Sequence, residues 1–286
     1  MTSFAFSVHR PDYRDALLFG IVAVAISAIP AVFGVPYSVG IVGALRILEG
    51  DIPYRDFWTI YAPGHFYLLA LLFFVFGKYL VIASAARAVF IAASGSVLFL
   101  IARDLKMTRQ AAATVAGLFV LMLWRPDFGL STYEPALFFI LIGWLVLVRS
   151  GASLSTRAAL AAGASVGVAA WFKHDIAVYA AMAMVLGRLI EQAGGIGPRR
   201  WHETIRSALL ISAGAAAMVL PVALWSWRVA GRDAFQDVIW FAVTDFPKLR
   251  RTVYPGFLPQ LSRMTGTQAT GTVPPVTNAT PRAELS

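Results

Sequence analysis

The chain has 286 residues, of which 58% are hydrophobic and only 14% are charged, with a formal net charge of +9 and a mean hydropathy of +0.70. Soluble domains carry about 25% charged residues, so the composition excludes an ordinary soluble domain and, for most of the length, a disordered chain. The lack of cysteine excludes disulfides, iron–sulfur clusters, thiol nucleophiles and thiolate zinc sites. The basic excess does not indicate a nucleic-acid partner, because there is no soluble surface to present it. We therefore expect an all-α, polytopic membrane protein.

Eight apolar stretches approach or reach the length of about 20 residues that a helix needs to cross a bilayer. In chain order they are Ala16–Gly34, Ala62–Gly77, Tyr79–Ala102, Gln110–Trp124, Thr132–Val148, Ala158–Phe172, Ile176–Leu186 and Ser207–Trp227. The first is predicted to be a retained helix and not a signal peptide. Asp12 and Asp15 lie at its amino end, and no clean small-residue cleavage site follows.

Basic residues gather in four segments that should face the cytoplasm, because short cytoplasmic loops are enriched in Lys and Arg. These segments are the N-terminus with Arg10 and Arg14, Arg103–Arg109, Arg149–Arg157 and Arg188–Arg206. They share one side only if Ala62–Gly77 does not cross. This stretch is therefore predicted to dip into the outer leaflet and return, with breaks at Pro63-Gly64 and Gly77. About seven spans result, with the N-terminus inside and the C-terminus outside.

Two further helices are expected at the outer surface, which completes a transmembrane module over residues 1–258. Ser38–Leu48 is predicted to be a short amphipathic helix ended by Gly50, and Asp233–Phe246 an interfacial helix with apolar residues at helical spacing. Residues 259–286 are rich in Thr, Pro, Gly and Ala and are predicted to form a disordered polar tail.

Ionisable residues converge on the outer interface under this topology. Those in loops and turns are Asp51, Arg55, Asp56, Lys173, His174 and Asp175. A loop carboxylate is suited to act as a general base or to hold a divalent cation, and Lys with His is suited to clamp a phosphate. The alternative for each is a solvated turn. Arg87, about eight residues into its helix, is either a snorkelling side chain or a phosphate ligand. Glu134 is expected to offset a helix dipole.

Several short motifs in a specific order resemble a known family. The outer loop reads Ile47-Leu48-Glu49-Gly50-Asp51-Ile52-Pro53-Tyr54-Arg55-Asp56-Phe57, followed by Ala62-Pro63-Gly64-His65-Phe66-Tyr67 and an apolar stretch that ends in Phe76-Gly77. Arg87 comes next, and Lys173-His174-Asp175 follows a Gly/Ala-rich helix. Over roughly Ala16–Tyr179 the chain resembles the membrane-embedded GT-C glycosyltransferases. The branch is the bacterial one related to protein mannosyltransferases, aminoarabinose transferase and lipopolysaccharide-core galacturonosyl transferases.

The resemblance implies a polyprenyl-phosphate-linked sugar donor and a lipid, glycan or protein acceptor at the outer face of a bacterial inner membrane. It implies an outer-loop carboxylate that deprotonates the acceptor hydroxyl, with inversion at the sugar carbon, while cations neutralise the departing phosphate. We expect Asp56 or Asp51 to be the base. The expected phosphate ligands are Arg55, Arg87, Lys173 and His174, with Asp175, His65 and Glu134 in support.

Two departures from the family pattern keep other functions open. Many members carry an acidic residue directly after the first span, where this chain reads Gly34-Val35-Pro36-Tyr37-Ser38. Members also continue through further spans and an outer domain, so we expect a C-terminally truncated enzyme, either active or an inactive fragment. The alternatives are a transporter or flippase, with Arg87 and Glu134 along its pathway, and a non-catalytic assembly subunit. Ionisable residues at one face and no visible repeat argue against the transporter.

Overall fold

The computed structural model of the chain describes residues 13–33, 39–123, 129–151, 154–193 and 201–244. Within these ranges the chain forms helices joined by turns, with no strand, which confirms the all-α fold class. The chain divides into two compact units, Met1–Trp240 and Phe241–Ser286. In the second unit the structure describes only α11 (Phe241–Thr244), so the predicted tail at 259–286 lies outside the described residues.

The helices of the first unit follow the apolar stretches of the sequence. They are α1 (Tyr13–Phe33), α2 (Val39–Leu48), α3 (Gly64–Phe76), α4 (Leu80–Asp104), α5 (Arg109–Leu123), α6 (Tyr133–Ser150), α7 (Thr156–Ala170), α8 (His174–Ala193), α9 (Trp201–Ala230) and α10 (Arg232–Phe235). Two boundaries differ from expectation. Helix α8 continues past Leu186 because Gly187 does not break it, and the expected helix at Asp233–Phe246 is divided by a π-helical turn at Gln236–Trp240.

Among the described residues, three helices are both long and apolar enough to cross a membrane, namely α4, α6 and α9. Helices α2, α3, α5 and α7 are apolar but shorter, with 10–17 residues each. These lengths agree with a membrane protein. The count of seven crossings stays a prediction.

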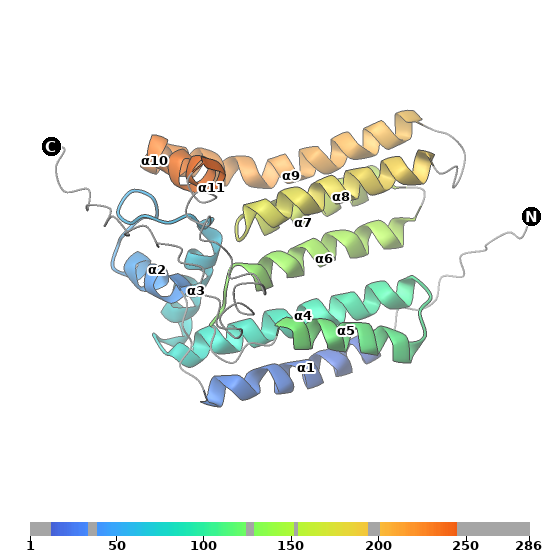
Figure 1. Cartoon of the computed structure of the whole chain (residues 1–286), viewed down its shortest axis with the longest axis horizontal. Coiled ribbons are helices and arrows are strands. Elements are labelled where there is room, and N and C mark those ends of the chain that lie inside the picture. Colours follow the sequence, from blue (N-terminus) through green and yellow to red (C-terminus); the bar gives the residue numbers. More distant parts are fainter. Residues whose placement is uncertain (1–12, 34–38, 124–128, 152–153, 194–200, 245–286) are drawn as a thin grey trace, which may run out of the picture. The chain divides into compact units, whose positions relative to one another are not determined.

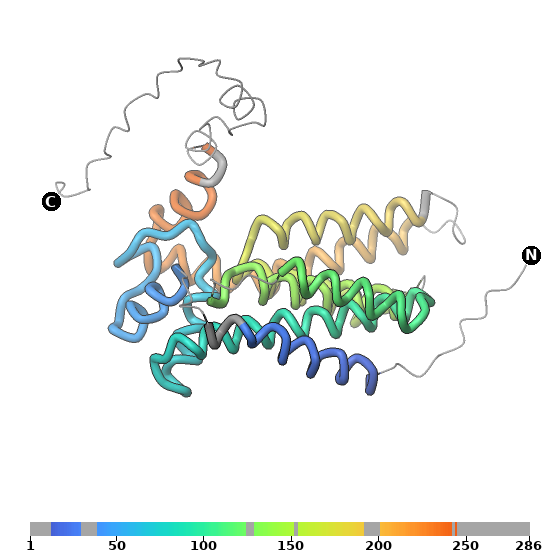
Figure 2. The backbone as a smooth tube through the Cα atoms, turned by 60° about the horizontal axis from the view of Figure 1, so that its bottom comes forward, coloured from blue at the N-terminus to red at the C-terminus, as the bar shows by residue number. Residues whose placement is uncertain are grey.

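Helices α1 and α4 to α9 run side by side, while α2 and α3 lie together at one end of them (Figure 1). The rotated view shows the same separation (Figure 2). We call this end the α2–α3 end. At the opposite end, Arg109 of α5 pairs with Asp15 of α1 at 2.9 Å, and Arg149 of α6 pairs with Asp104 of α4 at 2.8 Å. Successive long helices therefore alternate in direction.

Small residues allow α7 and α9 to pack more extensively than any other pair of helices. A Cβ atom added to Gly163 would lie 2.0 Å from the carbonyl oxygen of Ile211, and one added to Gly214 would lie 2.3 Å from that of Leu160. Both contacts are with backbone atoms, which cannot turn aside as a side chain can. Glycine at these positions is what lets the two helix backbones approach, as is usual where membrane helices associate.

Replacing Gly163 with alanine should therefore lower the stability of the chain. Because the added methyl group meets the α9 backbone, we expect the free energy of unfolding in detergent to fall by about 1–3 kcal/mol, as for other overpacked cores. Gly117→Ala is the matched control, because nothing lies within 4 Å of a Cβ added there. Alanine favours helix over glycine, so the control should be neutral or more stable by about 0.5–1 kcal/mol. Equal effects of the two substitutions would contradict the close contact.

The side on which each end lies can be tested with reporter fusions. If α3 does not cross, a reporter fused after Lys78 should be outside the cytoplasm and one fused after Lys106 inside it, since only α4 separates them. Activity of an enzyme that works on one side of the membrane only reports each location. With the N-terminus in the cytoplasm, which a reporter fused at the N-terminus would establish, the reverse pattern would show that α3 crosses.

Candidate functional site

The loop after α2 is organised by Arg46, which lies in the last turn of that helix. Its Nε donates to Oδ2 of Asp51 at 2.6 Å, and its Nη2 donates to the carbonyl oxygen of Asp56 at 2.8 Å. Its guanidinium carbon also lies 4.7 Å from the centroid of the Phe57 ring. Sequence reasoning did not single out Arg46. A basic residue at the end of an amphipathic helix, five residues before an aspartate, could have indicated that Arg46 pairs with the loop.

Asp56 is exposed, and Arg55 forms a bidentate ion pair with it. Nε and Nη2 of Arg55 donate to Oδ1 and Oδ2 of Asp56 at 2.9 and 2.7 Å, and the backbone N–H of Ile52 donates to Oδ2 at 2.7 Å. The hydrogen bonds from Arg55, followed by the one from Ile52, hold the pKa of Asp56 below its ordinary value. The carboxylate is thus ionised, and it becomes a better proton acceptor when Arg55 leaves it.

Tyr54 anchors the same loop in the protein interior. It adopts a positive φ of 68°, and its hydroxyl donates to the carbonyl oxygen of Tyr61 at 2.8 Å. Burial raises the pKa of Tyr54 well above its ordinary range, and the charge of Asp237 adds to this. Asp237 lies buried in the π-helical turn, and no pattern in the sequence indicates that it pairs with the loop. The tyrosine therefore stays protonated and serves as a fixed donor.

Arg87 and Glu134 form a buried ion pair between α4 and α6. Nε of Arg87 donates to Oε1 of Glu134 at 2.9 Å, and the two side chains are only 7% and 6% exposed. Nη2 of Arg87 also donates to the carbonyl oxygen of Leu123 at the end of α5. The other carboxylate oxygen accepts from the backbone N–H and the hydroxyl of Ser131, at 3.0 and 2.5 Å. Glu134 does lie in the first turn of its helix, as expected, and in addition it neutralises Arg87.

Lys173, which lies between α7 and α8, presents a cation beside the imidazole of His174, the first residue of α8. Nζ of Lys173 donates to Oδ2 of Asp175 at 2.9 Å and lies 5.0 Å from the centroid of the Tyr133 ring. Nδ1 of His174 is buried and has no hydrogen-bond partner in the part of the chain that the structure describes. The Asp175 carboxylate accepts hydrogen bonds from Nζ of Lys173 and from the backbone N–H of Ile176.

Burial governs the protonation of this turn, which precedes the predicted span from Ile176. Burial lowers the pKa of His174 and outweighs the opposing charge of Asp175, and the charge of Lys173 lowers this pKa further, so the imidazole is neutral near pH 7. Burial opposes ionisation of Asp175, but the hydrogen bonds from Lys173 and from the Ile176 N–H outweigh it and leave the pKa of Asp175 below its ordinary value.

His65 is 2% exposed and packs between α2 and α3. A Cβ added to Gly40 would lie 2.7 Å from its ring, and the centroid of the Phe66 ring lies 4.0 Å from its own. These contacts place His65 in the packing beneath the loop.

An apolar cavity of about 520 Å³ opens beside these polar groups, between α3, the end of α7 and α9. Its lining residues are Pro63, Gly64, Tyr67, Leu68, Leu71, Trp171, Phe172, Val222 and Trp225. The N–H of Gly64 donates to the carbonyl oxygen of Trp171 at 2.7 Å, and the Trp171 indole donates to the carbonyl oxygen of Met218 at 2.8 Å. Lys173 follows the lining residue Phe172 directly in the sequence.

The predicted site residues therefore all lie at the α2–α3 end, and apart from His65, which packs beneath the loop, they form three separate groups. Asp51, Arg55 and Asp56 belong to the loop, Arg87 and Glu134 to the buried pair, and Lys173, His174 and Asp175 to the turn. Among the described residues, no group of three His, Asp or Glu side chains is placed to hold a metal ion. The chain matches no protein-family model, no curated protein and no solved structure.

The ion pair of Arg87 and Glu134 yields a prediction that tests whether Arg87 serves to neutralise Glu134 in the fold. Arg87→Met alone leaves Glu134 as an unpaired buried charge and should lower the free energy of unfolding by about 3–5 kcal/mol, while the double variant Arg87→Met/Glu134→Leu should recover most of the loss. Denaturant unfolding in detergent measures both. Arg109→Gln, in an exposed pair with Asp15, is the control and should cost less than about 1 kcal/mol. A double variant as unstable as Arg87→Met would contradict the pairing argument.

Proposed function

We propose that the chain is a membrane glycosyltransferase, or the membrane module of one, that uses a polyprenyl-phosphate-linked sugar donor. The observation that carries the proposal is the α2–α3 end. An ionised loop carboxylate, a cation beside a neutral imidazole and an apolar cavity all belong to this end. Such a donor has a long apolar chain, a phosphate and a sugar, and each of these groups has a counterpart here.

The proposed setting is a bacterial inner membrane, with the N-terminus in the cytoplasm and the α2–α3 end outside. Seven crossings, by α1 and α4 to α9, are part of the proposal. The alternating directions of these helices support it, as does the concentration of Arg and Lys in the segments that join them at the opposite end.

In the proposed reaction, Asp56 is the base and Arg55 changes partner. The donor phosphate attracts the Arg55 guanidinium away from Asp56, because Arg binds phosphate through the same pair of donors that it uses for a carboxylate. Asp56 then takes the proton of the acceptor hydroxyl as the acceptor oxygen bonds to the anomeric carbon. The bond from that carbon to the phosphate oxygen breaks, and its electron pair leaves with the polyprenyl phosphate.

Lys173 and His174 are proposed to bind the phosphate from the turn. Lys173 neutralises charge as it develops on the leaving oxygen, and the His174 imidazole offers a hydrogen bond without adding a second charge. Arg87 reaches the phosphate only if it leaves Glu134. The buried pair thus favours Lys173 and Arg55 as the principal ligands, with Arg87 supporting the helices that carry them.

The proposal is tested by following the breakdown of the donor. The full chain is placed in vesicles of bacterial polar lipids with undecaprenyl-phosphate-linked mannose, aminoarabinose or galacturonate and an outer-membrane lipid extract as acceptor. Release of undecaprenyl phosphate is measured by mass spectrometry. One of the donors should be consumed, and Asp56→Asn should slow consumption by at least about 100-fold, the lower range for loss of a general base.

Asp15→Asn is the matched control, because Asp15 is also an arginine-paired aspartate but lies at the opposite end. It should leave the rate unchanged. A normal rate in Asp56→Asn with a loss in Asp51→Asn would move the base to Asp51. Movement of the donor between leaflets without its cleavage would favour a flippase, and neither cleavage nor movement would favour an assembly subunit.

A further inference from the structure

Arg46 holds the loop that carries Asp56 through three contacts of different kinds. Its Nε bonds the Asp51 carboxylate, and its Nη2 bonds the main-chain carbonyl of Asp56. Its guanidinium also lies against the Phe57 ring. Two arginines therefore hold Asp56 separately, since Arg46 binds its main chain and Arg55 binds its carboxylate.

The Phe57 ring joins Arg46 to the packed residues beneath the loop. It meets the Phe66 ring edge to face, and the two ring centroids lie 5.8 Å apart. Phe66 is fully buried in α3, and a Cβ atom added to Gly43 of α2 would lie 2.3 Å from its ring. Contacts therefore run from α2 through Arg46 to the loop, from the loop to α3, and from α3 back to α2.

The turn that contains Asp56 is shaped by hydrogen bonds within it. The N–H of Tyr54 donates to the carbonyl oxygen of Phe57 at 3.0 Å, and the N–H of Asp56 donates to that of Ile52 at 2.9 Å. The N–H of Ile52 in turn donates to Oδ2 of Asp56 at 2.7 Å. These three bonds all join residues within 52–57, so they shape the turn without attaching it to a helix. Arg46 supplies the hydrogen bonds that attach it to α2.

We propose that Arg46 is the positioning residue that keeps Asp56 in place while Arg55 transfers to the donor phosphate. This role rests on the proposed function, in which Asp56 loses the bidentate partner of its side chain. The bond from Arg46 to the Asp56 carbonyl and the bond from the Ile52 N–H to the carboxylate do not involve Arg55, so both remain during the transfer. Asp56 then meets the acceptor hydroxyl in a fixed position, as general-base catalysis requires.

The charge of Arg46 also favours the ionised form of Asp56. The hydrogen bonds from Arg55 and Ile52 are the main causes of the low pKa of Asp56, and the charge of Arg46 lowers this pKa further. Asp51, the neighbouring carboxylate, is neutralised by Arg46 at 2.6 Å. When Arg55 moves to the phosphate, Arg46 therefore still favours an ionised Asp56 that is ready to accept a proton.

The rate of donor breakdown by the full chain in the vesicles described above, measured against pH and donor concentration, tests this role. Arg46→Gln should lower kcat about 10- to 100-fold, as a small misplacement of a catalytic group does, and leave the KM for the donor unchanged. Because a positive charge is lost, the acid limb of the kcat profile should move to higher pH. Arg46→Lys keeps the charge but lacks the planar pair of donors, so it should lower kcat without moving the limb.

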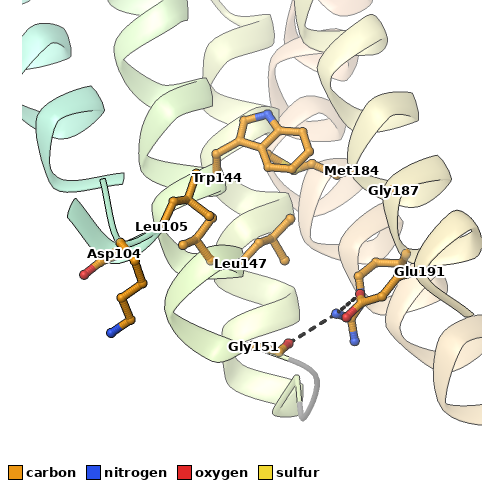
Figure 3. A pocket seen from close by; sticks show the side chains of 11 residues that line it. Asp104, Leu105, Trp144, Leu147, Gly151, Met184, Gly187 and Glu191 are labelled. Carbon is orange, nitrogen blue, oxygen red and sulfur yellow. Dashed lines mark hydrogen bonds and ion pairs between the residues drawn. The ribbon is translucent and has the colours of Figure 1, made fainter. Parts of the chain in front are cut away.

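Arg188→Gln is the matched control. Arg188 pairs with Glu191 at 2.7 Å and donates to the carbonyl oxygen of Gly151 at 3.2 Å, so it makes the same two kinds of bond as Arg46. It lies at the opposite end, beside a cavity of about 480 Å³, where Figure 3 shows Gly151 and Glu191. Its substitution should leave kcat, KM and the pH profile unchanged.

Hydrogen–deuterium exchange followed by mass spectrometry separates the attachment of the loop from the chemistry. In Arg46→Gln, peptides that cover residues 50–58 should exchange faster, while peptides from α4 should exchange as in the unaltered chain, which shows that the variant is folded. Normal kcat in Arg46→Gln, a change confined to KM, or unchanged exchange of the loop would each overturn the role of Arg46. If the unaltered chain breaks down no donor, the proposed function itself fails, and the role of Arg46 in catalysis fails with it.

Discussion

The buried ion pair between Arg87 and Glu134 is the constraint around which the α2–α3 end is assembled. A guanidinium and a carboxylate can be withdrawn from water only together, and here each also needs backbone or hydroxyl partners. Arg87 finds one in the Leu123 carbonyl, and Glu134 finds two in Ser131. The pair thereby fixes α4, α5 and α6 to one another at the level where Tyr133 meets Lys173. The buried ion pair therefore also helps to fix the position of Lys173, which lies against the Tyr133 ring.

Helix α3 is the shortest of the helices that follow a predicted apolar stretch. It has 13 residues, fewer than the about 20 that a helix needs to cross a bilayer, and a glycine lies at each of its ends. Gly64 lets the helix start against the Trp171 carbonyl, and Gly77 ends it at a φ of 92°. The resulting helix covers α2 and supports the loop that carries Asp56. A short apolar helix therefore serves as the floor of a polar site.

Periodicity and breakers in the sequence predicted the helices well, because each apolar run is bounded by charge, glycine or proline. They also placed Asp56, Lys173 and His174 at one end. They did not reveal which charges pair. Arg87 and Glu134 are 47 residues apart, and Asp237 meets Tyr54 from nearly two hundred residues away. Such pairs depend on how distant segments pack against one another, which the local pattern of the sequence does not specify.

Trp171 has a consequence for selectivity. Its carbonyl is held by α3 and its indole by α9, so both walls of the apolar cavity are joined through one residue by hydrogen bonds. A cavity wall held only by apolar packing can move by small amounts when a wider ligand binds. Movement of this wall would instead break a hydrogen bond of Trp171. Under the proposed function, the cavity should accordingly discriminate among the lipid chains of donors by thickness, such as methyl branching near the phosphate, and be indifferent to the length of chain that extends beyond it into the bilayer.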